Sequence, residues 1–403
     1  MGLPRIAMLS IMFGCLGYAL YSVESFTSLF MHESFSLGFT IIGIIFTLSN
    51  LAGSVFQIYT GRLGDRIGHK KMLLITYAVA SVSMIMLYIT ARYIHNFIIL
   101  SGFFLLLASG IWGSFPPFSS LVSLSSRNRI NGFTMTRVAL NVGTGVGPGV
   151  AGILIGLYGF PTMYLSAFAA TVLAFAVGIM FKPPVQEKAT EKSMETYPKF
   201  SFKNINRTII LLSISSLLLT ILLAQDTVTL PNYASIVRNL STEQIGLVFT
   251  SNGILVVLMQ YPVTRAIHRI GAARGYVVGL LFFSIGVFSF AFDSSILQFI
   301  GSEAVMTFGE DFLDPSGSSI VANLSPEKRL GEHMGVFNSF NAIGYSMGPL
   351  IGGMIISVTL NPYYIWSVVS LPGFIAVLIY MLFVMKKVVN AMGKSGKAIS
   401  ERV

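Results

Sequence analysis

The chain has 403 residues, of which 54% are hydrophobic and only 10% are charged, and its mean hydropathy is +0.75. Soluble domains carry about 25% charged residues, so this composition excludes a soluble globular protein and indicates an integral membrane protein. The net charge of +10 is also compatible with nucleic-acid binding, but the positions of the basic residues fit a membrane protein better, and we expect no nucleic-acid partner.

Twelve apolar runs follow one another along the chain, each close to or above the roughly 20 residues that cross the hydrocarbon core as a helix. A glycine-proline pattern occurs in both halves of the chain, so we predict an all-α protein with twelve transmembrane helices in two pseudo-symmetric six-helix bundles. The predicted domains are residues 1–181 and 208–388, joined by a cytoplasmic linker at 182–207 and followed by a cytoplasmic tail at 389–403. The predicted spans are residues 5–30, 38–60, 72–90, 97–124, 132–158, 162–181, 209–231, 246–263, 275–292, 296–322, 334–360 and 364–385.

The basic residues indicate how the chain is oriented in the membrane. Of the 26 Lys and Arg residues, all but Arg92 and Arg238 lie at the termini or in or beside the even-numbered connections. The positive-inside rule therefore places both termini of this multi-pass plasma-membrane protein in the cytoplasm. The first run has a single basic residue at its start and eleven spans after it, so we interpret it as a helix and not as a signal peptide. The lone Cys15 excludes an intrachain disulfide, and we expect no metal site and no cofactor.

The first run contains Glu24, which lies about 27 Å along the helix from its cytoplasmic start at 1.5 Å per residue. Asp226 lies at a near-equivalent position of the seventh run, with Gln225 beside it and Pro231 nearby, which indicates a broken helix. Glu24 has two interpretations that the sequence leaves open: a functional group, or a residue at the outer interface that reaches water.

The connection between the second and third runs reads Gly61-Arg-Leu-Gly-Asp-Arg-Ile-Gly-His-Lys-Lys71. Its glycines permit a tight turn, and its carboxylate lies among basic residues that compensate its charge. The segment resembles the major facilitator superfamily signature G-x-L-x-D-R-x-G-x-[RK]-[RK] at every position. The resemblance implies a major facilitator fold and a cytoplasmic gate loop that latches the two halves together when the carrier is open to the outside. The gate-loop residues are Gly61, Gly64, Asp65, Arg66, Gly68, Lys70 and Lys71.

We expect Asp65 to reach the positive N-terminal end of the eleventh helix, because that helix also starts in the cytoplasm. The second half repeats the loop as Arg269, Ile270 and Gly271, but it has His268 in place of the aspartate. The latch is therefore predicted to be asymmetric.

The fourth run contains Trp112, Phe115 and Phe118 around two prolines, and we expect this aromatic group to line a cavity for apolar substrates. Arg137 enters the fifth run near its cytoplasmic start. Its side chain has two options, an ion pair with an acidic group or snorkelling to the lipid headgroups, and we favour snorkelling.

The fifth run carries the glycine-proline pattern, which resembles the signature of proton-coupled exporters within the same superfamily. Small residues four apart let two helices touch, and the proline bends the helix, so the pattern can seal one side of a rocking interface. The pattern recurs half a chain length later in the eleventh run. The helix-packing residues are Gly143, Gly147, Pro148 and Gly152, and then Gly344, Gly348, Pro349 and Gly352.

Carboxylates inside predicted spans are the candidate proton-coupling or substrate-binding groups, because an unpaired charge in a membrane is costly. By helical spacing, Glu303, Glu310 and Asp314 share one face of the tenth helix, which we expect to face the cavity. Asp314 precedes Pro315 and alternatively caps a helix break. The candidates are Glu24, Asp226, Glu303, Glu310, Asp311 and Asp314.

The region from the tenth to the eleventh run resembles that of bacterial multidrug carriers. Together with the gate loop, this resemblance implies a secondary transporter that exports hydrophobic or amphipathic small molecules in exchange for protons, and we expect a monomer in the lipid bilayer. The alternatives are a proton-linked uptake symporter for a small solute, a lipid or lipid-linked substrate flippase, and a receptor without transport activity. No G-x-x-x-x-G-K-[ST] segment is present, so ATP is not expected to drive transport, and we expect no catalytic residue and no enzymatic activity.

Overall fold

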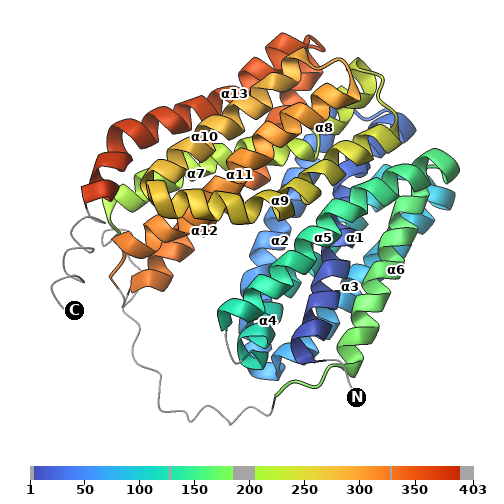
Figure 1. Ribbon diagram of the computed structural model, residues 1–403. Coiled ribbons are helices and arrows are strands. Elements are labelled where there is room, and N and C mark those ends of the chain that lie inside the picture. The colour runs from blue at the N-terminus through green and yellow to red at the C-terminus, as the bar shows by residue number, and fades with distance from the viewer. Residues whose placement is uncertain (1–3, 127–128, 185–204, 327–328, 391–403) are drawn as a thin grey trace.

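The computed structural model describes residues 4–126, 129–184, 205–326 and 329–390 (Figure 1). Most of the predicted linker at 182–207 and of the predicted tail at 389–403 lies outside these residues. The first half contains α1 (Arg5–Phe35), α2 (Phe39–Ile67), α3 (His69–Ile89) with η1 (Thr90–Ile94), α4 (Phe97–Ser125), α5 (Arg129–Tyr158) and α6 (Pro161–Met180). The second half contains α7 (Arg207–Leu223), η4 (Ala224–Asp226), α8 (Thr229–Asn232), η5 (Tyr233–Val237), α9 (Thr242–Ile270), α10 (Ala272–Ser289), η6 (Phe290–Phe292), α11 (Ile296–Leu324), α12 (Leu330–Val358), α13 (Pro362–Ile379) and η8 (Tyr380–Val384).

Local sequence explains where many of these helices begin and end. The side chains of Asn96 and Asn361 accept hydrogen bonds from the first backbone N–H groups of α4 and α13, and Ser241 forms a capping box with Gln244 at the start of α9. The helices α2 and α9 both end at a glycine with positive φ, Gly68 at 96° and Gly271 at 85°.

The helices form two bundles, one from α1 to α6 and one from α7 to α13 (Figure 1). Within the described residues, eleven segments are long and apolar enough to cross a membrane. The helix α11 falls outside that group, and it is the helix that carries Glu303, Glu310, Asp311 and Asp314. With α11 counted, the predicted all-α fold of twelve spans in two bundles is confirmed.

The seventh span is broken, as the sequence predicts. The helix α7 ends at Leu223, a short 3-10 segment holds Gln225 and Asp226, and helix resumes at Thr229. The Gln225 side chain donates to the carbonyl oxygens of Ile221 at 2.7 Å and of Gly348 at 3.1 Å. These bonds satisfy backbone carbonyl groups where the helix changes pitch.

The two bundles meet at one end of the molecule and separate at the other (Figure 1). We call the end where α1 begins and α13 finishes the inner end, and the opposite end the outer end. The helices α4 and α12 stand apart at the inner end, and a cavity between the bundles lies on that side. This opening exposes the candidate site.

Candidate functional site

Near the outer end, α2 and α12 touch backbone to backbone. A Cβ added to Gly43 would lie 2.5 Å from the carbonyl oxygen of Pro349 and 2.8 Å from Cα of Leu350, which leaves room for hydrogen alone. The hydroxyl groups of Thr40 and Ser357 hydrogen-bond across the same contact at 3.0 Å. One side of the outer end is therefore closed by main-chain packing.

The helices α5 and α9 close the other side in the same way. A Cβ added to Gly246 would lie 2.5 Å from the carbonyl oxygen of Pro148, and the Thr242 hydroxyl donates to the carbonyl oxygen of Gly152 at 3.2 Å. The two contacts relate equivalent positions of the two chain halves, with Pro148 matching Pro349. We call these contacts, Gly43 with Pro349 and Gly246 with Pro148, the outer seams.

Apart from Gly152, which also contacts α9, the glycines of the repeated pattern pack within their own bundle. A Cβ on Gly147 would lie 2.7 Å from the carbonyl oxygen of Tyr18 on α1, and one on Gly348 would lie 2.8 Å from that of Ile221 on α7. Gly143 also packs on α1, and Gly344 and Gly352 also pack on the seventh span. These glycines thus hold α5 and α12 against the first span of their own bundle, while Pro148, Gly152 and Pro349 contact the other bundle.

Inward of the outer seams, side chains of both bundles line a cavity. One part, of about 290 Å³, lies among Trp112 and Phe115 of α4, Arg137 of α5, and Glu310 of α11. A larger part, of about 710 Å³, is bordered by α2, α4 and α12 and shares Trp112 with the first. The predicted aromatic group divides: Trp112 and Phe115 line the cavity, whereas Phe118 is buried against Phe13 with ring centroids 4.1 Å apart.

The helix α11 contributes three carboxylates to the smaller part of the cavity, from Glu310, Asp311 and Asp314. It continues unbroken past Pro315 to Leu324, so the alternative that Asp314 caps a helix break is wrong. Glu303, on the same helix face, is fully buried away from the cavity.

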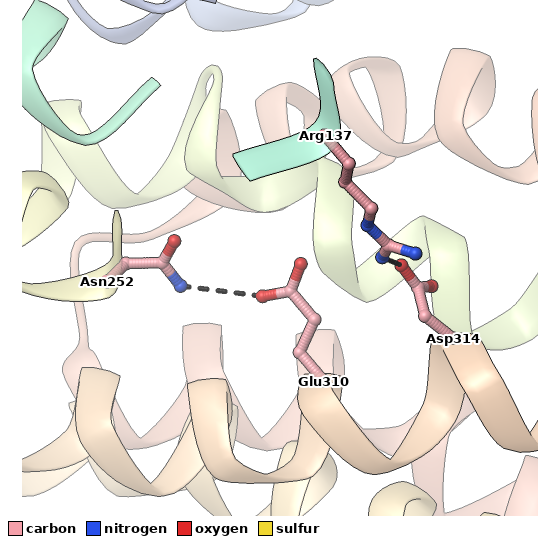
Figure 2. Close-up of polar contacts among 4 residues, drawn as sticks. All are labelled: Arg137, Asn252, Glu310 and Asp314. Carbon is pink, nitrogen blue, oxygen red and sulfur yellow. Dashed lines mark hydrogen bonds and ion pairs between the residues drawn. The ribbon is translucent and has the colours of Figure 1, made fainter. Parts of the chain in front are cut away.

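Arg137 pairs with Asp314 across the cavity (Figure 2). Its Nη2 lies 2.6 Å from Oδ2 of the aspartate, and the side chains are 52% and 61% exposed. The preference for snorkelling was wrong, because the inner half of α5 faces the second bundle and offers the guanidinium a carboxylate in place of the headgroups. This ion pair joins the two bundles at the open end.

Glu310 has different partners from those of Asp314. Figure 2 shows Asn252 of α9 donating to Glu310, with Nδ2 3.4 Å from Oε2, and the same amide donates to the Thr307 hydroxyl at 2.8 Å. Thr307 in turn donates to the backbone carbonyl of Glu303 at 2.8 Å. Both carboxylate oxygens of Glu303 lack a hydrogen-bond partner among the described residues. Neighbouring carboxylates of one helix thus have a cationic partner, a neutral partner or none.

Glu24 and Asp226 come together at a small pocket of about 20 Å³ between the bundles. Glu24 is only 7% exposed, so the interpretation of this residue as an interface group that reaches water is wrong. The Tyr345 hydroxyl of α12 donates a long hydrogen bond of 3.5 Å to Oε2 of Glu24. The first helices of the two bundles therefore bring equivalent carboxylates to one place.

The gate loop lies at the inner end, away from the second bundle. Asp65 is 72% exposed, and its Oδ1 lies 3.5 Å from Nε2 of His69 in the same loop. Lys70 donates to the carbonyl oxygen of Ile179 on α6 at 2.9 Å. Within the described residues, no hydrogen bond or ion pair connects Asp65 to α12. The remaining loop positions lie at the end of α2 and the start of α3. Gly61, Gly64 and Arg66 belong to α2, Gly68 lies between the two helices, and Lys71 belongs to α3.

Sequence reasoning missed the uncharged polar residues of the site. Asn252 and Tyr345 contact the candidate carboxylates, and Asn341 accepts a hydrogen bond of 2.5 Å from Ser216 beside the cavity. Each is a polar residue inside an apolar span, a signal that a search restricted to charged residues passes over. The described part of the chain holds no group of three His, Cys, Asp or Glu side chains arranged for a metal ion.

Comparison with known proteins agrees with the family resemblance of the gate loop. A family model described as Major Facilitator Superfamily matches residues 8–242 and 216–399. The multi-drug resistance efflux pump PmrA homolog of Lactococcus lactis is 25% identical over 78% of this chain and 78% of its own, and the quinolone resistance protein NorA of Staphylococcus aureus is 23% identical over 84% and 87%. The crystal structure of the nucleoside transporter NupG superposes with a TM-score of 0.77 at 14% identity, covering 94% of this chain and 98% of that one.

Proposed function

Because this chain belongs to the Major Facilitator Superfamily and is a multi-pass membrane transporter, we propose that it exports amphipathic small molecules in exchange for protons. The carboxylates of α11 in a partly aromatic cavity are the observation that carries this proposal. Two relatives named as a multi-drug resistance efflux pump and a quinolone resistance protein support export.

The cavity chemistry suits a ligand with an apolar body and a polar or cationic group. Trp112 and Phe115 offer aromatic surface on one wall, and three carboxylates face them from α11. Arg137 supplies a single positive charge against Glu310, Asp311 and Asp314. The cavity therefore keeps an excess of acidic groups, which attracts a proton or a cationic ligand.

Proton coupling follows from the carboxylates that lack a cationic partner. Glu24, Asp226 and Glu303 lie between or within the bundles, where a lone charge is costly. Among the residues that the structure describes, the side chain of Glu310 has only the Asn252 amide as a hydrogen-bond partner. A proton and a cationic substrate that compete for such groups produce exchange, because each binds only after the other has left.

Orientation rests on the basic residues. With both termini on the cytoplasmic side of the plasma membrane, the inner end faces the cytoplasm. The described state can then bind substrate from the cytoplasm. The protein acts as a monomer. Its domains, 1–181 and 208–388, rock against each other, which opens the outer seams and closes the inner end. In that second state, Asp65 of the gate loop reaches the start of α12 and acts as the latch.

One observation favours a second candidate function, proton-linked uptake of a small polar solute. A further part of the cavity, of about 210 Å³, is lined by Ser216, Thr220, Asn338 and Asn341, which can hydrogen-bond a neutral polar ligand. The three carboxylates of α11 outnumber the single Arg137 beside them, and this acidic excess makes the exporter the better proposal.

The test is transport in liposomes under an imposed pH gradient, with cationic, neutral and lipid-like compounds. We expect movement against the proton gradient for cationic amphiphiles, and its loss in Glu310→Gln, with weaker effects in Glu24→Gln and Asp226→Asn. Transport that persists unchanged in all three variants refutes the coupling assignment. Movement in the same direction as protons refutes export and supports the uptake function. Movement of the lipid-like compounds alone supports a flippase instead.

A further inference from the structure

The inner end of α9 differs from the inner end of α2, although the two repeat each other. Both helices end in the same turn, at Gly68 and Gly271, with φ of 96° and 85°. The first copy carries Asp65, which pairs with His69, whereas the second has His268 at the equivalent position. The turn is retained in α9 without the acidic residue of the latch.

Two exposed arginines and an exposed tyrosine occupy this part of α9. Arg265 and Arg269 are one helical turn apart, and the guanidinium carbon of Arg265 lies 5.6 Å from the ring centroid of Tyr261. Tyr261 is 71% exposed. These three side chains border a shallow hollow of about 490 Å³ on the surface of α9. Within the described residues, neither guanidinium has a hydrogen bond or an ion pair.

An apolar stripe continues from this hollow toward the outer end along the same face of α9. At 100° per residue, Leu247, Ile254 and Leu258 lie in line with Arg265, and their side chains are between 50% and 61% exposed. Eleven residues separate Ile254 from Arg265, or about 16 Å of helix, which matches half of a hydrocarbon core about 30 Å thick. The part of the stripe between Ile254 and Arg265 therefore has the length of one leaflet, with the arginines at headgroup depth. Leu247 lies about 27 Å from Arg265, in the other leaflet.

We propose that this surface binds one anionic phospholipid of the leaflet at the inner end. Its acyl chains lie on Ile254 and Leu258, the Tyr261 ring sits at the interface, and Arg265 and Arg269 hold the phosphate. A guanidinium donates two parallel hydrogen bonds to a phosphate, so the hollow complements the headgroup in charge and in shape. The site lies on the membrane face of the second bundle, outside the transport cavity, since its lining residues and those of the cavity differ.

The test measures lipid retained by purified full-length protein in native mass spectrometry. Delipidated protein in dodecyl maltoside is titrated with dioleoylphosphatidylglycerol or dioleoylphosphatidylcholine. Two arginines at a membrane surface support a preference for the anionic lipid of roughly 30-fold. We expect Arg265→Gln with Arg269→Gln to reduce that preference to about threefold or less.

The matched control is Lys386→Gln with Lys387→Gln. It removes two exposed charges near the inner end of the last span, and it should retain the full preference. If both double variants lose the lipid preference equally, bulk charge attracts the lipid and the proposed site is refuted. Undiminished preference in the arginine variant overturns it as well. Glycerol phosphate at the same concentration should not be retained, and retention equal to that of the lipid contradicts a lipid occupant. Unchanged elution volumes on size exclusion establish that the variants are folded.

Discussion

The ion pair between Arg137 and Asp314 leads to a quantitative prediction for cation binding. Its side chains are 52% and 61% exposed, and exposed pairs contribute about 0.2–1 kcal/mol to stability. We therefore expect Arg137→Gln to lower the free energy of unfolding by less than about 1 kcal/mol. The same substitution removes the positive charge with which a cationic ligand competes for Asp314.

The expected gain in affinity follows from Coulomb's law. Two unit charges about 4 Å apart interact by about 1 kcal/mol in water and about 4 kcal/mol at an effective dielectric constant of 20. A half-exposed site lies toward the lower value, so we expect about 1–2 kcal/mol of repulsion to be removed, equivalent to a dissociation constant roughly 5- to 30-fold lower. Arg137→Lys keeps the charge and should change the constant by less than about threefold.

Tryptophan fluorescence can report this binding. The chain has two tryptophans, of which Trp112 lines the cavity and Trp366 is buried with 1% exposure. Quenching by tetraphenylphosphonium therefore reports on Trp112 over a constant background. An uncharged aromatic ligand of similar size provides the control for shape. Equal tightening of the neutral ligand, or equal effects of the Gln and Lys variants, would refute the role of the Arg137 charge.

Two further predictions concern the outer end. Gly43→Ala should drive α2 and α12 apart, because the added methyl group meets the backbone at Pro349 and Leu350. The distance between spin labels at the outer ends of both helices should therefore increase. Gly102→Ala is the control, because Gly102 has open space around it and its substitution should leave that distance unchanged. Burial raises the pKa of Asp293, just before α11, from 3.8 to about 6 against the opposing influence of Ser302 and Arg238. Its stabilising contribution is thus complete below pH 3.8 and lost as the pH rises to about 6. The melting temperature of Asp293→Asn relative to wild type should therefore rise between about pH 4 and about pH 6 and stay level at higher pH. A pH-independent difference contradicts this assignment.

The sequence predicted the elements of this fold because the membrane imposes simple rules. Apolar runs of sufficient length mark the spans, and Gln225 with Pro231 marks the break in the seventh. The prediction that Glu310 and Asp314 face the cavity needed only the periodicity of one helix. Such features are local, so a single segment of sequence contains the information.

Contacts between the bundles could not be predicted in the same way. Arg137 and Asp314 are far apart in the chain, and their meeting depends on how α5 and α11 tilt toward the cavity. Sequence spacing placed Glu303 on the same face as Glu310, yet the packing around α11 buries the first and leaves the second at the cavity. Asn252 carries no charge, so nothing in its own segment indicated that it would contact Glu310.

The closed and open ends of the molecule are held by different kinds of contact, and only those of the open end involve charge. The outer seams are main-chain contacts at Gly43 and Gly246, which no ligand or proton alters directly. At the open end, the bundles are joined through Arg137 and Asp314, a contact that depends on charge and lies in the cavity. A ligand shifts the balance between two states only through its different affinity for each. In the proposed export cycle, a cation that displaces Arg137 from Asp314 breaks the ion pair of the described state and then gains contacts as the bundles close around it. Under this proposal, the charge of the bound ligand also determines which end of the cavity opens.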